Sequence, residues 1–338
     1  MMKRFLYSCV FTAVLCLPLS PAGENWHIYF TSPDNRNPIK MNGNPEHALV
    51  AEIDRCSVSI DGAFYDITSP RIVDAFLRAC KRGVKIRLVT DDSNYGRDGV
   101  NILMRAGIPV VTDTGRGLMH NKFAILDGRA LWTGSYNVTE NCAEKNNNNA
   151  ICFQSSEMAD IYQAEFNEMF EDRVFGNKKD TGGPFSSLRK KYYVKLGESD
   201  INAYFSPDDN VERIIIKRLE KARKSIHFMA FSFTSDGIGD VMIKKHRAGV
   251  MVAGLIEKRG SGTRYCEYKR FLAEGIPVHL DRNPFVMHHK VIVIDGEIVI
   301  TGSYNFSKGA STKNDENIVI IDNADAARAY LEEFKRLY

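Results

Sequence analysis

The sequence predicts an α/β protein made of two tandem domains of one kind, each with a β-sheet flanked by helices. Two observations support this fold class. Strand-like and helix-like segments alternate along the chain, as in a sheet covered by helices, and a block the size of an ordinary domain occurs twice. With 338 residues, 44% of them hydrophobic and 26% charged, the chain is long and apolar enough for two packed domains.

The internal repeat is visible as matching segments at a nearly constant separation. SIDGAFYDIT at Ser59–Thr68 corresponds to SIHFMAFSFT at Ser225–Thr234. MHNK at Met119–Lys122 corresponds to MHHK at Met287–Lys290, and TGSYN recurs at the same separation as this second pair. A period as long as a whole domain indicates a duplicated domain rather than a solenoid.

The elements of each copy follow from local patterns. Residues 57–65 and 84–91 are rich in β-branched residues and predict strands. Between them, Pro70–Gly83 has apolar residues at helical spacing, a proline at its start and a glycine at its end, and predicts a helix. The second copy repeats this pattern, with helices predicted over 210–225 and 237–249.

Composition divides the chain into four parts. Two basic residues precede an apolar run from Phe5 to Leu19, which predicts a cleaved secretory signal peptide and an exported protein, periplasmic or secreted. An uncleaved membrane anchor is the alternative, although this run is short for a membrane span of about 20 residues. The predicted parts are the signal peptide, residues 1–22; the first domain, 23–175; a polar, glycine-containing linker, 176–200; and the second domain, 201–338.

Export permits disulfides, but the cysteines do not form a disulfide framework. Five cysteines lie outside the signal peptide, an odd number at irregular spacing. Cys142–Cys152 and Cys56–Cys80 are the local candidate pairs, and buried free thiols are the alternative.

Five polar residues that follow Met287 form a pattern with chemical meaning. His288 and Lys290 are two apart, so on a strand they point to the same face. Asp295 and the glycine after it predict a hairpin turn, and the returning strand brings Ser303 and Asn305 beside them. This set suits a phosphodiester: lysine, serine and asparagine bind the phosphate while histidine attacks or protonates.

The first copy repeats all five positions at the same spacing, as His120, Lys122, Asp127, Ser135 and Asn137. One His-x-Lys is a weak signal, but two copies that share five positions are hard to explain by packing. HNKFAILDG…GSYN and HHKVIVIDG…GSYN resemble the paired HxKxxxxD motifs of the phospholipase D superfamily. The resemblance covers nearly the whole chain after the signal peptide, and each copy is similar in size to the minimal endonuclease and cardiolipin-hydrolase subgroup, whose members work as dimers.

The resemblance implies two phospholipase D-like domains, each a mixed β-sheet flanked by helices, related by a pseudo-two-fold axis. The chain would then be a monomer with an internal pseudo-dimer and one central site. The family reaction has two steps and needs no cofactor: one histidine forms a phosphohistidine, and the other protonates the leaving alcohol and then activates water. Family precedent favours His120 as the nucleophile. Asp127 and Asp295 would be structural, because they lie at the far end of each strand.

The two copies differ at one position downstream of the motif histidines. At the same distance from each histidine, the second copy has Glu316 and the first has Asn148. Family members often have a carboxylate here that holds a histidine. Glutamate accepts the Nδ1–H bond and supports a cationic ring, whereas asparagine accepts it without charge; a polar loop is the alternative for the NNNN segment. We therefore expect divided labour between the two histidines, with Glu316 catalytic and Asn148 structural.

No cluster of metal ligands is visible in the sequence. His289 is next to His288 and therefore points to the opposite face of the strand, which favours a buried or surface residue over a ligand. The predicted site contains no metal.

These observations predict a phosphoric diester hydrolase, with a phospholipid head group as the favoured substrate. Residues 23–185 carry a net charge of −4, which would repel a polyanion, and the apolar stretch Pro284–Met287 could make a peripheral membrane contact. A metal-independent endonuclease acting on DNA or RNA is the first alternative, because residues 186–338 carry +5 and include the basic stretch Glu257–Arg264. A non-catalytic phosphate-binding module is the second.

Overall fold

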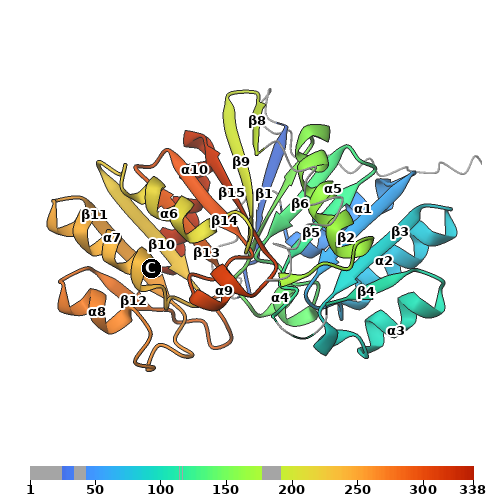
Figure 1. Ribbon diagram of the computed structural model, residues 1–338, viewed down its shortest axis with the longest axis horizontal. Helices are drawn as coiled ribbons and strands as arrows, with labels where there is room; N and C mark the ends of the chain where they lie inside the picture. Colours follow the sequence, from blue (N-terminus) through green and yellow to red (C-terminus); the bar gives the residue numbers. More distant parts are fainter. Residues whose placement is uncertain (1–24, 34–42, 114, 116, 177–191) are drawn as a thin grey trace, which may run out of the picture.

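The structure is a computed structural model that describes residues 25–33, 43–113, 115, 117–176 and 192–338. The predicted signal peptide lies outside these residues. Two α/β halves lie side by side and meet along the centre of the molecule (Figure 1), which confirms the predicted fold class. They are called the first repeat, 25–176, and the second repeat, 192–338. Among the described residues, no helix has the length and apolar composition to cross a membrane.

The first repeat has one seven-stranded mixed sheet in the order β1-β7-β6-β5-β2-β3-β4. Strands β2, β3 and β4 are parallel, and the other neighbours are antiparallel. The strands are β1 Trp26–Phe30, β2 Ser59–Phe64, β3 Lys85–Thr90, β4 Val110–Thr112, β5 Lys122–Leu126, β6 Ala130–Gly134 and β7 Asn149–Phe153. The α-helices are α1 Pro45–Arg55, α2 Pro70–Lys81, α3 Asp98–Arg105, α4 Glu140–Glu144 and α5 Ser156–Phe170.

The second sheet follows the same order, β9-β15-β14-β13-β10-β11-β12, and adds β8 at the edge beside β9. Its strands are β8 Tyr193–Leu196, β9 Ser199–Ser206, β10 Ser225–Ala230, β11 Met251–Ile256, β12 Val278–Leu280, β13 Lys290–Ile294, β14 Ile298–Gly302 and β15 Glu316–Asp322. The α-helices are α6 Val211–Leu219, α7 Asp236–Arg247, α8 Tyr268–Ala273, α9 Lys308–Thr312 and α10 Ala324–Leu337.

Two predicted segments differ from the structure. The end of the predicted linker forms β8 and the start of β9, because YVKL alternates and places Val194 and Leu196 inward. The helix predicted over 210–225 ends at Leu219, because the chain turns there and the backbone N–H groups of Arg223 and Lys224 bind Asp295 instead.

The helix predicted after residue 69 forms for the predicted reasons. Ser69 caps α2 by accepting a hydrogen bond from the N–H of Ile72, with proline at the first helical position. Ile72, Phe76 and Ala79 form its buried face against the outer side of the first sheet.

The inner faces of the two sheets share one hydrophobic core with α5 and α10. The Tyr162 ring on α5 lies 4.9 Å from Phe123 of its own repeat and 4.8 Å from Phe205 of the other, both edge to face. The repeats are therefore packed together rather than tethered, and this packing fixes the two motif strands relative to each other.

All five cysteines that the structure describes are free, and four of them are buried. Neither local candidate pair forms a disulfide, so the alternative of buried free thiols describes these residues.

Candidate active site

The two motifs meet at the boundary between the repeats. His120 and His288 lie two residues before the first residues of β5 and β13. The N–H of His120 donates to the carbonyl of Asp315, 3.0 Å away, and the N–H of His288 donates to the carbonyl of Asn147 at 2.8 Å. Because each motif is bonded to the segment of the other repeat that leads into β15 or β7, both histidines belong to one site.

Each histidine is held by a residue of the opposite repeat. Nδ1–H of His120 donates to Oε2 of Glu316 at 2.7 Å. Nδ1 of His288 lies 3.0 Å from Oδ1 of Asn148 and 3.1 Å from the carbonyl oxygen of Ser135, and both oxygens can accept its hydrogen bond. Glu316 thus holds the histidine of the other copy. Asn147–Asn149 of the NNNN segment are buried, so this segment is not a solvated loop. In both rings Nε2 is left to meet a substrate.

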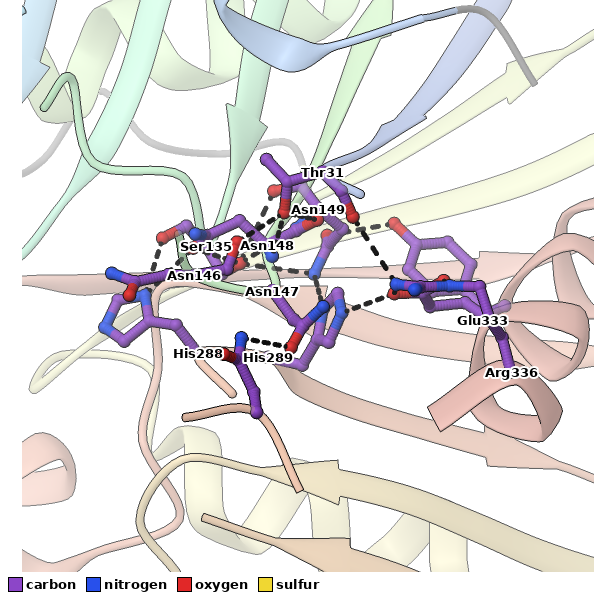
Figure 2. A network of polar contacts seen from close by, with 12 residues as sticks. Thr31, Ser135, Asn146, Asn147, Asn148, Asn149, His288, His289, Glu333 and Arg336 are labelled. Carbon is purple, nitrogen blue, oxygen red and sulfur yellow. Dashed lines mark hydrogen bonds and ion pairs between the residues drawn. The ribbon is translucent and has the colours of Figure 1, made fainter. Parts of the chain in front are cut away.

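Figure 2 shows that neighbouring asparagines of this segment form hydrogen bonds on its opposite sides. Asn148 reaches His288, while Asn149 donates from Nδ2 to Nδ1 of His289 at 3.0 Å. Nε2–H of His289 donates to Glu333 at 3.1 Å, and Glu333 also accepts from Arg336. His289 is therefore fully buried in a polar network behind the site, on the strand face opposite His288.

Burial controls the charge of the two histidines. It lowers the pKa of His120 and His288 well below the usual range, and the neighbouring lysines lower both further. Burial therefore favours the neutral form of both rings. Burial also raises the pKa of Glu316 to about 7, although Lys122 opposes this shift. A bound phosphate would offset the lysine charges and favour protonation of one histidine.

The two lysines lie on the same strand face as the histidines. Nζ of Lys122 donates to the carbonyl of His120 at 2.6 Å, and Nζ of Lys290 donates to that of His288 at 2.8 Å. Burial lowers the pKa of Lys122 to about 8, and that of Lys290 falls well below its usual range for the same reason. An anionic ligand would stabilise their charged forms.

An aromatic pair in the site was missed from the sequence. Tyr65 packs edge-on against the ring of His120, 5.1 Å between centroids, and its face lies 5.3 Å from Nζ of Lys122. The Phe231 ring packs edge-on against the ring of His288, with 4.8 Å between centroids. Its centre lies 4.7 Å from Nζ of Lys290. Tyr65 and Phe231 occupy the same position in SIDGAFYDIT and SIHFMAFSFT, and this match is the sequence signal from which they could have been predicted.

The predicted phosphate-binding serines are engaged behind the histidines. The Ser135 hydroxyl accepts from the N–H of Asn149 at 3.1 Å and donates to Asn148, and the Ser303 hydroxyl accepts from the N–H of Asn317 at 3.0 Å. These bonds fix the segments that hold the histidines. The structure gives both hydroxyls partners within the protein rather than an open position in front of the lysines.

Asn137 and Asn305 differ from the serines. The Oδ1 atom of each is buried without a hydrogen-bond partner among the described residues. Since a buried polar atom without a partner is costly, and amide oxygen and nitrogen exchange places by a flip, these side chains are the ones left to bind a ligand's oxygens.

The two motif aspartates lie at the far ends of β5 and β13. Asp295 accepts from the N–H groups of Arg223, Lys224 and Ser225, at 2.9, 2.7 and 2.9 Å. Asp127 accepts equivalent bonds from residues 57–59. Both are at turns with positive φ, where aspartate is tolerated. Each ties its motif hairpin to the strand beside it and has no contact with the histidines.

A carboxylate cluster was not predicted. Asp91, Asp92 and Asp113 lie close enough together to hold a cation. Asp91 already accepts from the N–H of Met119, and Asp113 accepts from that of Asp92. These bonds position the loop before His120.

The fold and the site together define the class. A profile of the family "Cardiolipin synthase, PLD-like domain" matches residues 49–170 and again 215–338. The chain therefore belongs to the phospholipase D superfamily and contains two copies of its domain. The predicted domain limits at 23, 175 and 201 stay a prediction, since these matches begin inside them.

Individual relatives match over the length of about one repeat. "Phospholipase D" of Rickettsia conorii is 30% identical over 151 residues, which is 44% of this chain and 76% of that protein. "Mitochondrial cardiolipin hydrolase" of Chlamydomonas reinhardtii is 29% identical over 120 residues, 36% of this chain and 54% of that protein. These similarities make the chain a phosphodiesterase of this superfamily.

A solved structure covers both repeats. Phosphatidylserine synthase from Haemophilus influenzae is 14% identical and superposes with a TM-score of 0.65 over 86% of this chain and 83% of that one. At this identity the match supports the two-repeat fold alone.

Proposed function

We propose that the protein is an exported phosphodiesterase that releases the head group of phospholipids through a phosphohistidine intermediate. The observation that carries this proposal is the pairing of two buried His-x-Lys motifs, each histidine held at Nδ1 from the opposite repeat. Two imidazoles with fixed tautomers and two lysines in one site suit the charge of a phosphodiester. The charge of the first half and the apolar segment before His288 support a lipid over a nucleic acid.

In the first step Nε2 of His120 attacks phosphorus, and the P–O bond to the head-group alcohol breaks. His288, protonated while the substrate is bound, gives its Nε2 proton to the leaving oxygen. In the second step neutral His288 takes a proton from water, the water oxygen forms a new P–O bond, and the P–N bond breaks. The products are a free alcohol and a phosphatidate, and both histidines are restored.

Glu316 supports this assignment of roles. In the first step the attacking ring gains positive charge and the proton donor loses it. A carboxylate at Nδ1 of His120 stabilises the gain, as in a Ser-His-Asp triad. Beside the proton donor the same charge would hold the proton back, and His288 has a neutral asparagine there.

The test is a side-by-side assay of phosphatidylethanolamine and phosphatidylcholine vesicles against single- and double-stranded DNA, across a salt series. We expect free ethanolamine or choline and no DNA cleavage. DNA cleavage that falls steeply with salt, without head-group release, would make the protein an endonuclease. Phosphate binding without turnover of any of these would make it a binding module.

A further inference from the structure

Four large hydrophobic side chains are exposed on loops near the motif histidines. They form an apolar rim of Tyr95, Leu118, Tyr265 and Phe285, which are 44, 39, 61 and 44% exposed. Single exposed hydrophobic residues are common, but these occur as two similar pairs. Each repeat has a tyrosine in the loop that follows β3 or β11 and a second apolar residue in the loop that precedes the motif.

Strand pairing places the rim at the site's edge of both sheets. β2 and β3 are parallel and in register, Ala63 beside Val89. The chain leaves β2 at Tyr65, which contacts His120, and leaves β3 into the loop with Tyr95. The second repeat has the same arrangement in β10 and β11. In Figure 1 these loops lie along the lower edge of both halves.

Each motif-side apolar residue has a lysine of the other repeat near it. Nζ of Lys145, at the end of α4, lies 5.6 Å from the centre of the Phe285 ring. Lys313 holds the equivalent place at the end of α9, where the next residue, Asn314, accepts from the N–H of Leu118 at 3.1 Å. Both lysines are exposed. The same apolar-plus-lysine pair therefore occurs on both sides of the pseudo-two-fold axis.

One further basic residue lies against the exposed tyrosine of the second repeat. The guanidinium of Arg264 lies 4.6 Å from the centre of the Tyr265 ring. Three more exposed basic side chains lie in the loop after β11 and the loop before β13: Lys258, Arg259 and Arg282. Apolar and aromatic side chains mixed with lysine and arginine are typical of surfaces that lie in a membrane interface.

We propose that this rim docks the protein on the surface of an anionic phospholipid bilayer, with Leu118 and Phe285 in the interfacial apolar layer and Lys145 and Lys313 on head-group phosphates. The inference rests on the proposed function, because the site meets a bilayer when phospholipid is its substrate. A nucleic acid fits less well. Leu118, on the first-repeat side of the rim, offers no ring for a base to stack on.

The experiment measures co-sedimentation with vesicles, using the chain from residue 23 onward, which holds every described residue. Vesicles of pure phosphatidylcholine are compared with vesicles that also contain phosphatidylglycerol. One variant carries Leu118→Ser and Phe285→Ser, and another carries Lys145→Gln and Lys313→Gln. The matched controls change exposed residues away from the rim: Met251→Ser with Leu272→Ser, and Lys81→Gln with Lys221→Gln. Hydrolysis of the soluble diester bis(p-nitrophenyl) phosphate is followed in all of them.

We expect the wild type to prefer the anionic vesicles. The serine variant should bind them at least about tenfold more weakly, and the glutamine variant about twenty-five-fold more weakly, roughly fivefold for each lysine. The controls should bind like the wild type, and soluble diester hydrolysis should be unchanged in all variants.

Wild-type binding that is absent, or that the rim variants retain, overturns the docking proposal, and so does rim-dependent binding of single-stranded DNA in place of vesicles. The proposed function fails separately. If the protein docks on vesicles through the rim but hydrolyses neither lipid nor soluble diester, the docking proposal stands and the proposed function is contradicted.

Discussion

Nδ1 of His120 lies 2.7 Å from Oε2 of Glu316, and the two residues come from different repeats. The equivalent histidine, His288, has Asn148 in that place. The pseudo-two-fold axis therefore relates two histidine environments within one site that have similar geometry and unequal charge. The aromatic neighbours also make the side of His120 more polar, since Tyr65 carries a hydroxyl and Phe231 beside His288 does not. A sequence that began as two copies of one domain now has a charged and a neutral histidine environment.

Glu316→Gln should lower the rate of phosphohistidine formation by at least about tenfold, because it keeps the hydrogen bond and removes the charge that stabilises the imidazolium. Rapid-quench kinetics with a short-chain phospholipid measures this rate. Asn314→Ala removes a long contact to the same carboxylate and the bond that Asn314 accepts from the N–H of Leu118; it is the comparison variant and should have a smaller effect. Wild-type rates in Glu316→Gln would show that the charge is not used.

The pH dependence follows from the same carboxyl group. Burial raises the pKa of Glu316 to about 7 against Lys122 and Lys290, which lower it. Below this pKa the carboxyl is neutral and cannot stabilise His120, so activity should rise with pH through about 7, and this limb should vanish in Glu316→Gln. For stability the sign is opposite: between about 4.5 and 7 the folded chain holds a proton that the unfolded chain has lost, so folding stability falls as pH rises.

Moving the charge should move the intermediate. Glu316→Gln with Asn148→Asp transfers a carboxylate from the His120 side to the His288 side with little change in shape. The covalent adduct, mapped by mass spectrometry after an alkaline quench, should shift from His120 towards His288. Single Asn148→Asp is the control. An adduct that stays on His120 alone would mean that something other than this pair sets the roles.

The two histidines should act as one unit. His120→Ala and His288→Ala should each abolish turnover, and the double variant should lose almost nothing further, because groups that act jointly are not additive. Steady-state rates on the soluble diester test this. Near wild-type activity in either single variant would contradict a shared site.

Asp295→Asn should destabilise the fold without altering the chemistry. Burial favours the neutral form of this carboxyl, but three backbone N–H donors outweigh burial and lower its pKa. Replacing these charge-assisted bonds should cost about 1.5–3 kcal/mol in the free energy of unfolding, and asparagine still tolerates the positive φ. The stabilisation by the aspartate should disappear as pH falls through its lowered pKa. Denaturant titration measures the loss; an unchanged midpoint, or a reduced kcat in folded protein, would contradict a purely structural role.

Activity should persist in excess EDTA. Two lysines in the site supply the positive charge that a phosphodiester needs as its transition state forms. The assay is head-group release with and without chelator. Loss of activity that one divalent cation restores would contradict this prediction and would direct attention to Asp91, Asp92 and Asp113.

The repeat made most of the fold predictable. Because the two copies agree at MHNK and MHHK and at TGSYN, the hairpin of β13 and β14 and its placement of Lys290 could be derived from strand alternation alone. The extra strand β8 was harder to predict, since YVKL is short and follows a polar stretch.

The exchange of partners between repeats could not be derived from the sequence. Glu316 follows His288 in the second repeat, yet it contacts His120 of the first because the segments before β7 and β15 cross the boundary between the repeats. Likewise, the sequence grouped Ser135 and Ser303 with the phosphate ligands, whereas packing uses their hydroxyls to hold those segments. Spacing along a strand predicts which face a residue is on, and tertiary packing decides what lies opposite that face.

The most direct test of the proposed function is the mass of the covalent intermediate. The enzyme is mixed with dihexanoyl phosphatidylcholine, quenched in alkali within milliseconds and digested, and the peptide that contains His120 is weighed. We expect that peptide to carry one phosphatidyl group and choline to be released in equal amount in the same burst. Choline release with no adduct on His120 or His288, or no choline release from an enzyme that cleaves DNA, would contradict the account.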